Sequence, residues 1–511
     1  MENSRSKNTI KNIVLSGFNK IINILLPFIV RSVLISVLGV QYLGLNSLFI
    51  SILQVINLAE LGVSSAIVFS MYKPIAENDE NTICALMNLY KNLYKVIGSL
   101  IFLLGILIIP FLKIFIKGSY PTDINIYLLY IVYLLNTVMG YFFFAYKGAL
   151  LNAHQKSGVI SNINSIFIIV QNIIQIILLL IFRNYYAYII VMPIFTVLNN
   201  VKVAILVNKM YPMYKPRGKL NKEVTKNINK KVKGLLISKI CNTTKTTFDS
   251  IFISSFVGLT AVAIYSNYYY VMASILSLLV IITNAMIASV GNSLILETVE
   301  KNYSDMMKFN FIYSWISGIC TVCLLCLYQP FMKLWVGEEM TYPMHIVIAF
   351  CMYFYAVNLG GIRAIYHDAA GLWWEARYRA ILESILNLVL NIILTARFGV
   401  FGTIVGTLIS LIIVNYGYGT QIVFKYYFKG FKVKYFYFEH IKYTLVTTIN
   451  CIITYFIINK INDTGILDLI IKLVICLIIP NIINYMIYRK NKYFIKSLEM
   501  FRRILISIMH S

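Results

Sequence analysis

Apolar stretches of about twenty residues recur from one end of this chain to the other, and they limit its possible folds more than any other feature. A helix of that length just crosses the hydrocarbon part of a bilayer. Hydrophobic residues make up 59% of the 511 residues, whereas soluble domains contain roughly 45–50%. The polar segments between the stretches are too short to form a separate soluble domain. The sequence therefore predicts an all-α integral membrane protein.

Windows of about 20 apolar residues predict about fourteen transmembrane helices. They lie near 12–38, 43–72, 89–112, 124–146, 159–182, 185–208, 234–257, 261–290, 309–332, 344–362, 380–396, 400–424, 443–459 and 466–488.

Basic residues set the expected orientation. The net charge of +25 would suggest nucleic acid in a soluble protein, but in a membrane protein it indicates basic cytoplasmic loops. With a cytoplasmic N-terminus, 33 of the 45 Lys and Arg residues fall in cytoplasmic segments and 6 in outside loops. Those cytoplasmic segments are 1–11, 73–95, 147–158, 209–233, 291–308, 363–379, 425–442 and 489–511. We therefore expect both termini on the cytoplasmic side of a bacterial plasma membrane.

The two halves of the chain resemble each other at an offset near 220 residues. Gly39 and Gly258 separate helices at an offset of 219, and Pro110 and Pro330 end helices at an offset of 220. Six helices separate the copies, so both copies face the same way, as in transporters whose parallel lobes rock about a midplane cavity. The sequence predicts an N-terminal six-helix lobe over 1–208, a basic cytoplasmic linker over 209–233 and a C-terminal six-helix lobe over 234–424. Helices thirteen and fourteen follow within 425–488, and a basic amphipathic cytoplasmic tail over 489–511.

Four charged residues fall deep inside predicted helices, where a charge costs roughly 2.5–3.5 kcal/mol and therefore suggests function. They are Arg31, Glu60, Lys245 and Asp249. Lys245 and Asp249 are four residues apart on one helix face, within a polar stretch that includes Asn242 and Thr246. Such a stretch is expected to face a wet cavity, although a buried Lys245–Asp249 ion pair would also explain it.

These charges suit an anionic cargo. Fixed cations in a dry-walled cavity can replace the hydration of a pyrophosphate, and arginine can bind phosphate through two parallel hydrogen bonds. Amides such as Asn46, Asn136, Asn164, Gln171 and Gln175 could meet sugar hydroxyls, or could hold helices together. We therefore expect Arg31, Lys245, Asn242 and Thr246 to bind cargo, and Glu60 and Asp249 to couple an ion or pair charges.

Several motifs resemble one known family. They are the segments 31–46 (RSVLISVLGVQYLGLN), 58–67 (LAELGVSSAI), 249–254 (DSIFIS) and 368–374 (DAAGLWW). They are similar to bacterial polysaccharide flippases of the Wzx type, over about residues 15–425. The resemblance implies the fold of the multidrug/oligosaccharidyl-lipid/polysaccharide exporter superfamily, which has two pseudo-symmetric six-helix lobes plus two further helices.

The resemblance also implies a function and partners. The expected cargo is an undecaprenyl-pyrophosphate-linked oligosaccharide repeat unit for capsule, O-antigen or exopolysaccharide synthesis, moved from the inner to the outer leaflet by alternating access. The expected partners are the lipid bilayer, a polysaccharide polymerase and a chain-length regulator, and no nucleic acid. No nucleotide-binding G-x-x-x-x-G-K-[ST] run occurs in the sequence, so we expect a proton or sodium gradient, or the membrane potential, to supply the energy.

Two other functions remain open from the sequence. An ion-coupled exporter of drugs or organic cations would share the fold, but it would favour a more acidic cavity than these residues provide. A membrane polymerase or ligase would need a larger external loop than any in this chain. We expect no cofactor, and we expect Cys320, Cys323 and Cys326 to be buried by packing rather than to bind a metal.

Overall fold

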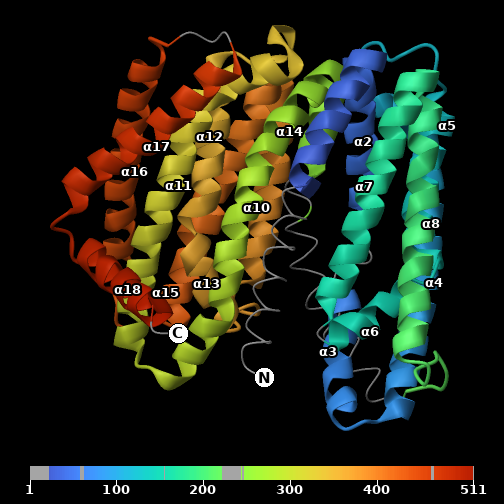
Figure 1. Cartoon of the computed structure of the whole chain (residues 1–511), viewed down its shortest axis with the longest axis horizontal. Helices are drawn as coiled ribbons and strands as arrows, with labels where there is room; N and C mark the ends of the chain where they lie inside the picture. The colour runs from blue at the N-terminus through green and yellow to red at the C-terminus, as the bar shows by residue number, and fades with distance from the viewer. Residues whose placement is uncertain are drawn as a thin grey trace. The chain divides into compact units, whose positions relative to one another are not determined.

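The computed structural model describes residues 22–57, 63–154, 156–220, 243, 247–461 and 465–509 (Figure 1). Within these ranges every regular element is a helix, and no strand occurs. The predicted all-α membrane fold is therefore confirmed.

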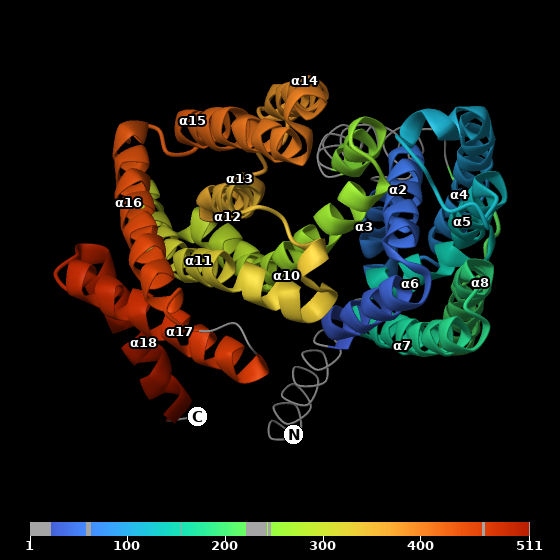
Figure 2. The ribbon, with the colours of Figure 1, turned by 90° about the horizontal axis from the view of Figure 1, so that it is seen from above.

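The chain divides into two compact units, Met1–Ala263 and Ile264–Ser511. The first unit begins with a helix over Ile22–Leu38 and contains another over 247–256. Its remaining helices are α2 (Val40–Ile56), α3 (Val63–Ala76), α4 (Glu80–Ile108), η2 (Ile109–Phe115), α5 (Ile126–Phe142), η3 (Ala145–Lys147), α6 (Gly148–Ala153), α7 (Ser157–Phe182) and α8 (Tyr185–Met210). Seen along the helices, α4, α5, α7 and α8 lie side by side (Figure 2).

The second unit is built on long helices that start with α10, which begins in the first unit and continues into the second. Its elements are α10 (Leu259–Leu296), α11 (Val299–Val336), η4 (Glu338–Met340), α12 (Met344–Leu359), α13 (Gly361–Ala369), α14 (Arg377–Ser410), the π-helix η5 (Leu411–Tyr418), α15 (Gly419–Tyr426), α16 (Val433–Ile458), α17 (Ile466–Tyr488) and α18 (Lys492–Met509). Most of the predicted linker 209–233 lies outside the described residues, so the predicted lobe boundaries stay predictions.

Nine helices among the described residues are long and apolar enough to cross a membrane, or ten if the bent pair Ile126–Phe142 and Ala145–Ala153 is one span. One of the nine, Arg377–Tyr426, has 50 residues and corresponds to two of the helices predicted from the sequence. Other predicted spans are represented by shorter apolar helices, including Ile22–Leu38 and Val40–Ile56.

The apolar surface of α4 is typical of a membrane helix, because α4 is apolar on two separate faces. One face is buried and includes Tyr90, Tyr94, Ile97 and Ile101. The other face carries Val96, Leu100, Leu103 and Leu107, whose side chains are 44–65% exposed. Both sets follow the spacing of three and four residues that marks one side of a helix. An exposed apolar stripe of this length is stable in lipid but not in water.

Polar side chains start several of these helices by accepting hydrogen bonds from otherwise unpaired backbone N–H groups. Asp79 accepts from the Thr82 amide at 3.0 Å at the start of α4. Asn125 and Asn184 do the same for α5 and α8, with distances of 3.0 and 2.8 Å to the amides two residues on. These capping residues explain why α4, α5 and α8 begin where they do.

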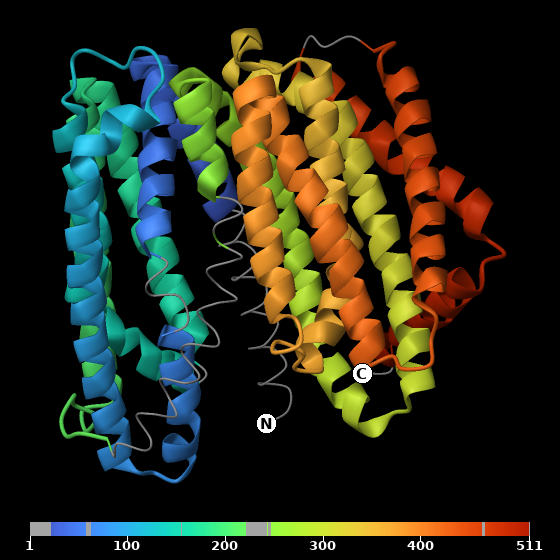
Figure 3. The same ribbon diagram turned by 180° about the vertical axis from the view of Figure 1, so that it is seen from behind.

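The helix α14 reverses direction at Gly399, which has φ 59° and ψ −139°. That conformation is accessible to glycine and not to residues with a Cβ atom. Across the reversal, Thr395 and Thr403 hydroxyls lie 2.8 Å apart, and the Asn387 amide donates to the Thr407 hydroxyl at 3.0 Å. The two arms of α14 therefore run antiparallel as neighbours, visible as adjacent orange helices in Figure 3.

Glycines allow the arms of α14 to approach closely. A Cβ atom at Gly402 would overlap the Leu394 carbonyl and lie 3.0 Å from the Thr395 amide nitrogen. One turn later, a Cβ at Gly406 would lie 3.2 Å from the Asn391 amide nitrogen. This small-x-x-x-small spacing is typical of closely packed membrane helices. The contact places the buried Asn387 and Asn391 beside hydroxyls of the other arm.

Candidate functional site

The predicted cargo-binding residue Arg31 lies in the helix Ile22–Leu38 of the first unit and is half-buried. Its positive charge acts on the buried phenol of Tyr188 in α8, so the two side chains are near neighbours. A guanidinium within an apolar helix is costly unless it has polar surroundings. Arg31 is the one residue predicted to bind cargo that lies within the described residues.

A network of phenols and amides supplies polar groups in the same unit. The Tyr133 hydroxyl donates to Asn46 Oδ1 at 2.5 Å and lies 2.9 Å from the Tyr185 hydroxyl. The Tyr185 ring stacks on the Tyr188 ring at 5.7 Å, and the Gln175 amide donates to the Tyr188 carbonyl at 3.1 Å. These contacts join α2, α5, α7 and α8 and place the phenol that interacts with Arg31 inside a hydrogen-bonded group.

Several amides that we considered for sugar contact are bonded to each other or to neighbouring helices. Asn164 accepts from Asn199 at 2.9 Å, and Asn136 accepts from Thr196 at 2.7 Å. Such bonds hold membrane helices together, which was the second role open to these residues from the sequence.

The polar stretch around Lys245 is only partly described. Lys245, Asn242 and Thr246 lie outside the described residues, as does Glu60, so their predicted roles stay predictions. Asp249 is fully buried in the helix 247–256 and has an interaction partner. Thr247 donates to the Thr243 carbonyl at 2.8 Å. Because Lys245 is outside the described residues, the choice between a Lys245–Asp249 ion pair and a wet cavity stays open.

A second buried group of charges, in the second unit, was not among the predicted site residues. Arg363 in α13 is 3% exposed, and Glu383 in α14 is fully buried. Glu383 Oε2 lies 3.1 Å from Arg379 Nη1, and both Glu383 oxygens accept from the Asn415 amide at 3.1 Å. Asn415 Oδ1 in turn accepts from Arg363 Nη2 at 3.1 Å. We call Arg363, Arg379, Glu383 and Asn415 the arginine cluster.

The arginine cluster depends on backbone features of its neighbours. A Cβ atom at Gly360 would lie 2.8 Å from Arg363 Nη2, and one at Gly419 would lie 3.2 Å from its Cζ. Only glycine leaves room for the guanidinium at both positions. Asn415 belongs to the π-helix η5, and π-helical turns are often found at functional sites.

The cluster has an excess of positive charge, since it contains two guanidinium groups and one carboxylate. Arg379 contacts Glu383 directly, and Arg363 is linked to it through Asn415. The Nε atoms of Arg363 and Arg379 are buried and have no hydrogen-bond partner in the described ranges. Sequence reasoning missed Arg363 because it follows the end of a predicted helix and was assigned to the cytoplasmic segment 363–379. Two features of the sequence could have indicated the cluster. They are the glycine pair Gly360 and Gly361, just before Arg363, and the i, i+4 spacing of Arg379 and Glu383.

No group of three or more His, Cys, Asp or Glu side chains that could hold a metal ion occurs among the described residues. The cysteines of α11 lie in an apolar contact region with α16 and α17. Cys326 is 3% exposed and packs with Val322, Ile458 and Cys476, with Cys323 against the same group. This arrangement agrees with the packing role that we expected for them.

Solved structures with the same fold are membrane transporters. The chain is similar to the lipid II flippase MurJ in an inward closed conformation, with a TM-score of 0.65, 20% identity, and coverage of 93% of this chain and 99% of that one. It also resembles an inward-facing multidrug resistance MATE family transporter of the MOP superfamily, with a TM-score of 0.61, 15% identity, and coverage of 78% and 94%. A third similar structure is the bent form of the Vibrio cholerae MATE transporter VcmN, with a TM-score of 0.51, 13% identity, and coverage of 82% and 97%.

The fold and the buried basic side chains thus define an integral membrane protein with the architecture of the MOP superfamily. Residues 9–290 match the family described as polysaccharide biosynthesis protein. That match covers more than half of the chain, so the chain belongs to this polysaccharide biosynthesis family. No curated protein sequence matches the chain.

Proposed function

We propose that this protein is a flippase that moves undecaprenyl-pyrophosphate-linked oligosaccharide repeat units from the inner to the outer leaflet of a bacterial plasma membrane. The observation that carries the proposal is the family match over residues 9–290 together with Arg31 inside the apolar helix Ile22–Leu38 of the matched region. A pyrophosphate cannot cross hydrocarbon without a substitute for its hydration, and a guanidinium supplies one. The glycan would be destined for capsule, O-antigen or exopolysaccharide.

In the proposed mechanism, the lipid-linked unit enters from the inner leaflet with its pyrophosphate drawn to Arg31 and Lys245. Asn242 and Thr246 contribute hydrogen bonds, while the polyprenyl tail remains in lipid. The two lobes then reorient by alternating access and release the unit outward. Both termini are proposed to be cytoplasmic, and a polymerase and a chain-length regulator are proposed to act on the exported units.

Energy is proposed to come from a proton or sodium gradient or from the membrane potential. A pyrophosphate that moves outward carries negative charge, and each elementary charge that crosses is worth roughly 2.3 kcal/mol per 100 mV. Glu60 and Asp249 are the proposed coupling groups. The burial of Asp249 supports this assignment, because a buried carboxylate can gain or lose a proton or cation as its surroundings change.

Arg31→Ala is expected to reduce polysaccharide export at least about tenfold, because a hydrogen bond to a charged group contributes roughly 1.5–3 kcal/mol. Arg31→Lys keeps the charge but loses the two-bond geometry, so its export should fall between wild type and Arg31→Ala. The measurement is the amount of exported polymer in cells whose own copy of the gene is deleted, together with the amount of protein in their membranes.

The matched control for Arg31→Ala is Arg397→Gln, which removes an exposed arginine at the tip of the α14 reversal. Its export should equal that of the wild type. Wild-type polymer levels in Arg31→Ala cells with normal protein amounts would contradict the assignment of Arg31. Transport of an organic cation such as ethidium by the purified protein would favour the exporter alternative, and polymer synthesis by the purified protein would favour the enzyme alternative.

A further inference from the structure

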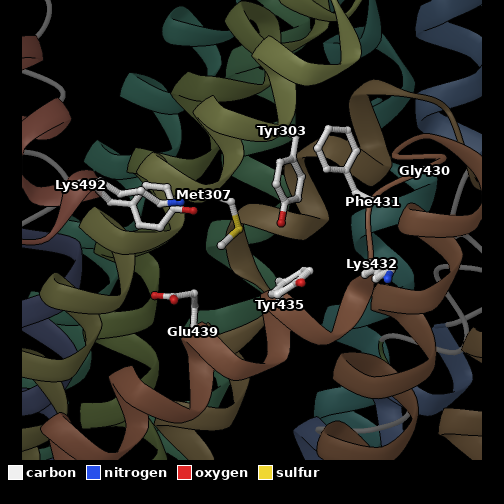
Figure 4. Close-up of a pocket in the computed structure, with 9 residues that line it drawn as sticks. Tyr303, Met307, Gly430, Phe431, Lys432, Tyr435, Glu439 and Lys492 are labelled. Carbon is white, nitrogen blue, oxygen red and sulfur yellow. The ribbon is translucent and has the colours of Figure 1, made fainter.

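A cavity of about 390 Å³ lies in the second unit where α11, α16 and α18 meet, away from the residues discussed above (Figure 4). Its lining residues come from the first turns of α11, the segment before α16, the first turns of α16 and the start of α18: Tyr303, Met307, Gly430, Phe431, Lys432, Tyr435, Glu439, Lys492 and Tyr493. All are described residues of one unit, so the cavity belongs to a single compact body.

Two lysines flank this cavity from opposite sides, with the phenols of Tyr303 and Tyr435 between them (Figure 4). Both Lys432 and Lys492 are exposed at its mouth. Glu439 is the one carboxylate in the lining, and Lys442 neutralises it through a contact of 2.9 Å. The cavity therefore carries an excess of positive charge.

The basic character extends beyond the lining. The segments 425–442 and 489–511, which provide its mouth, contain eleven Lys and Arg residues and two acidic residues. The first turn of α16 adds backbone N–H groups, since its N-cap Lys432 makes no side-chain capping bond. Unpaired N–H groups at a helix start attract anions.

Aromatic contacts make the walls of the cavity rigid. The Tyr303 ring stacks on the Phe431 ring with centroids 4.0 Å apart. Tyr493 and Met307 are buried behind the opening. Burial, with a further contribution from Glu439, raises the pKa of Tyr493, so its hydroxyl remains a hydrogen-bond donor at neutral pH. Tyrosines with an apolar body and a polar tip are typical of the membrane–water interface.

The helix α18 fixes one side of the cavity at that interface. Its residue Phe494 stacks on Trp315 of α11 at 5.7 Å, and Lys496 donates to the Ser304 hydroxyl at 2.9 Å. The helix has basic residues on one face and apolar residues on the other, as helices that lie in the membrane surface do. A ligand that reaches the cavity from this surface would have its charge in the cavity and its apolar part in lipid.

We propose that this cavity binds the phosphoglycerol headgroup of an anionic inner-leaflet phospholipid. The phosphate lies between the ammonium groups of Lys432 and Lys492, and the glycerol hydroxyls meet the hydroxyls of Tyr303 and Tyr435. Each lysine near an anionic membrane surface contributes roughly 1 kcal/mol of attraction. Bound lipid would join α11, α16 and α18, and this role is independent of which cargo the protein moves.

The test uses the full chain purified in nanodiscs that contain phosphatidylcholine and a minor fraction of phosphatidylglycerol. The number of phosphatidylglycerol molecules that remain with the protein is counted by native mass spectrometry. Lys432→Ala with Lys492→Ala is expected to reduce this retention at least about tenfold, in line with the loss of two lysine contacts. The matched control is Lys429→Ala with Lys490→Ala, which removes two exposed lysines of the same segments that do not line the cavity and should leave retention unchanged.

Glu439→Gln removes the one negative charge of the lining, so retention of phosphatidylglycerol should rise. Equal retention by the wild type and the Lys432→Ala, Lys492→Ala variant would overturn the proposal, provided that both melt at the same temperature. A decrease with Glu439→Gln, or a preference for zwitterionic phosphatidylcholine, would also overturn it. Complete displacement of the lipid by excess inorganic phosphate would assign the site to free phosphate instead, whereas retention under that condition supports the lipid.

Discussion

Glu383→Ala should destabilise the second unit by about 3–5 kcal/mol, because it leaves the Arg379 guanidinium without its carboxylate and the Asn415 amide without its acceptor. Glu383 is fully buried and contacts both Arg379 and Asn415. For a unit of this size the loss corresponds to a melting temperature about 10 °C lower. All four tryptophans of the chain lie in Ile264–Ser511, so their fluorescence during heating reports on this unit.

The matched control is Glu339→Ala, which removes an exposed carboxylate in η4 of the same unit and should leave the melting temperature unchanged. Adding Arg379→Met to Glu383→Ala removes the cation that Glu383 paired with, so part of the lost stability should return. That recovery would be non-additive, as expected for residues in one hydrogen-bonded network. A melting temperature for Glu383→Ala equal to the wild type would contradict the structural role of the arginine cluster.

Gly402→Ala should lower the stability of the second unit by about 1–3 kcal/mol, because the added methyl group needs space that the other arm of α14 occupies. The obstacle is the backbone of Leu394 and Thr395, which cannot move as a flexible side chain could. Separation of the arms would also stretch the Thr395–Thr403 bond of 2.8 Å. The same tryptophan-monitored melting experiment measures the effect.

Gly291→Ala provides the comparison for Gly402→Ala, since it introduces the same methyl group into the helix α10 of the same unit, where no atom lies within 4 Å of the new Cβ. Alanine favours a helix over glycine by up to about 1 kcal/mol, so this variant should be as stable as the wild type or slightly more stable. If Gly402→Ala behaved in the same way, the close approach of the α14 arms would be wrong.

Much of the fold could be predicted from the sequence because the membrane imposes a simple rule on apolar stretches. The reversal at Gly399 follows from glycine placement, whereas α4 begins at Glu80, nine residues before the predicted start at 89, because Asp79 caps the helix within a polar segment. The predicted helices 380–396 and 400–424 correspond to the two arms of Arg377–Tyr426. Details such as the π-helix η5 depend on tertiary packing and leave no periodic signal in the sequence.

The site was harder to predict, because depth in the membrane does not reveal which charges are neutralised by neighbours. Arg31 lies in the apolar helix Ile22–Leu38, and its interaction with Tyr188 required the structure. Its predicted role in cargo binding stays a prediction. Arg363 was missed because its burial comes from Gly360 and from Gly419, which lies 56 residues further along the chain. Contacts between such distant positions cannot be derived from local spacing.

The most direct test of the proposed function uses the purified protein in liposomes that contain an undecaprenyl-pyrophosphate-linked oligosaccharide. The glycan on the outer surface is removed with an enzyme that cannot enter the liposomes, and the fraction that remains protected is followed with time. The protein is expected to make protected glycan accessible, and Arg31→Ala is expected to slow this at least about tenfold. The measurement is repeated with a membrane potential and with proton and sodium gradients applied. If the protected glycan is lost at the same rate from liposomes with and without the protein under all these conditions, the result would contradict the proposed function.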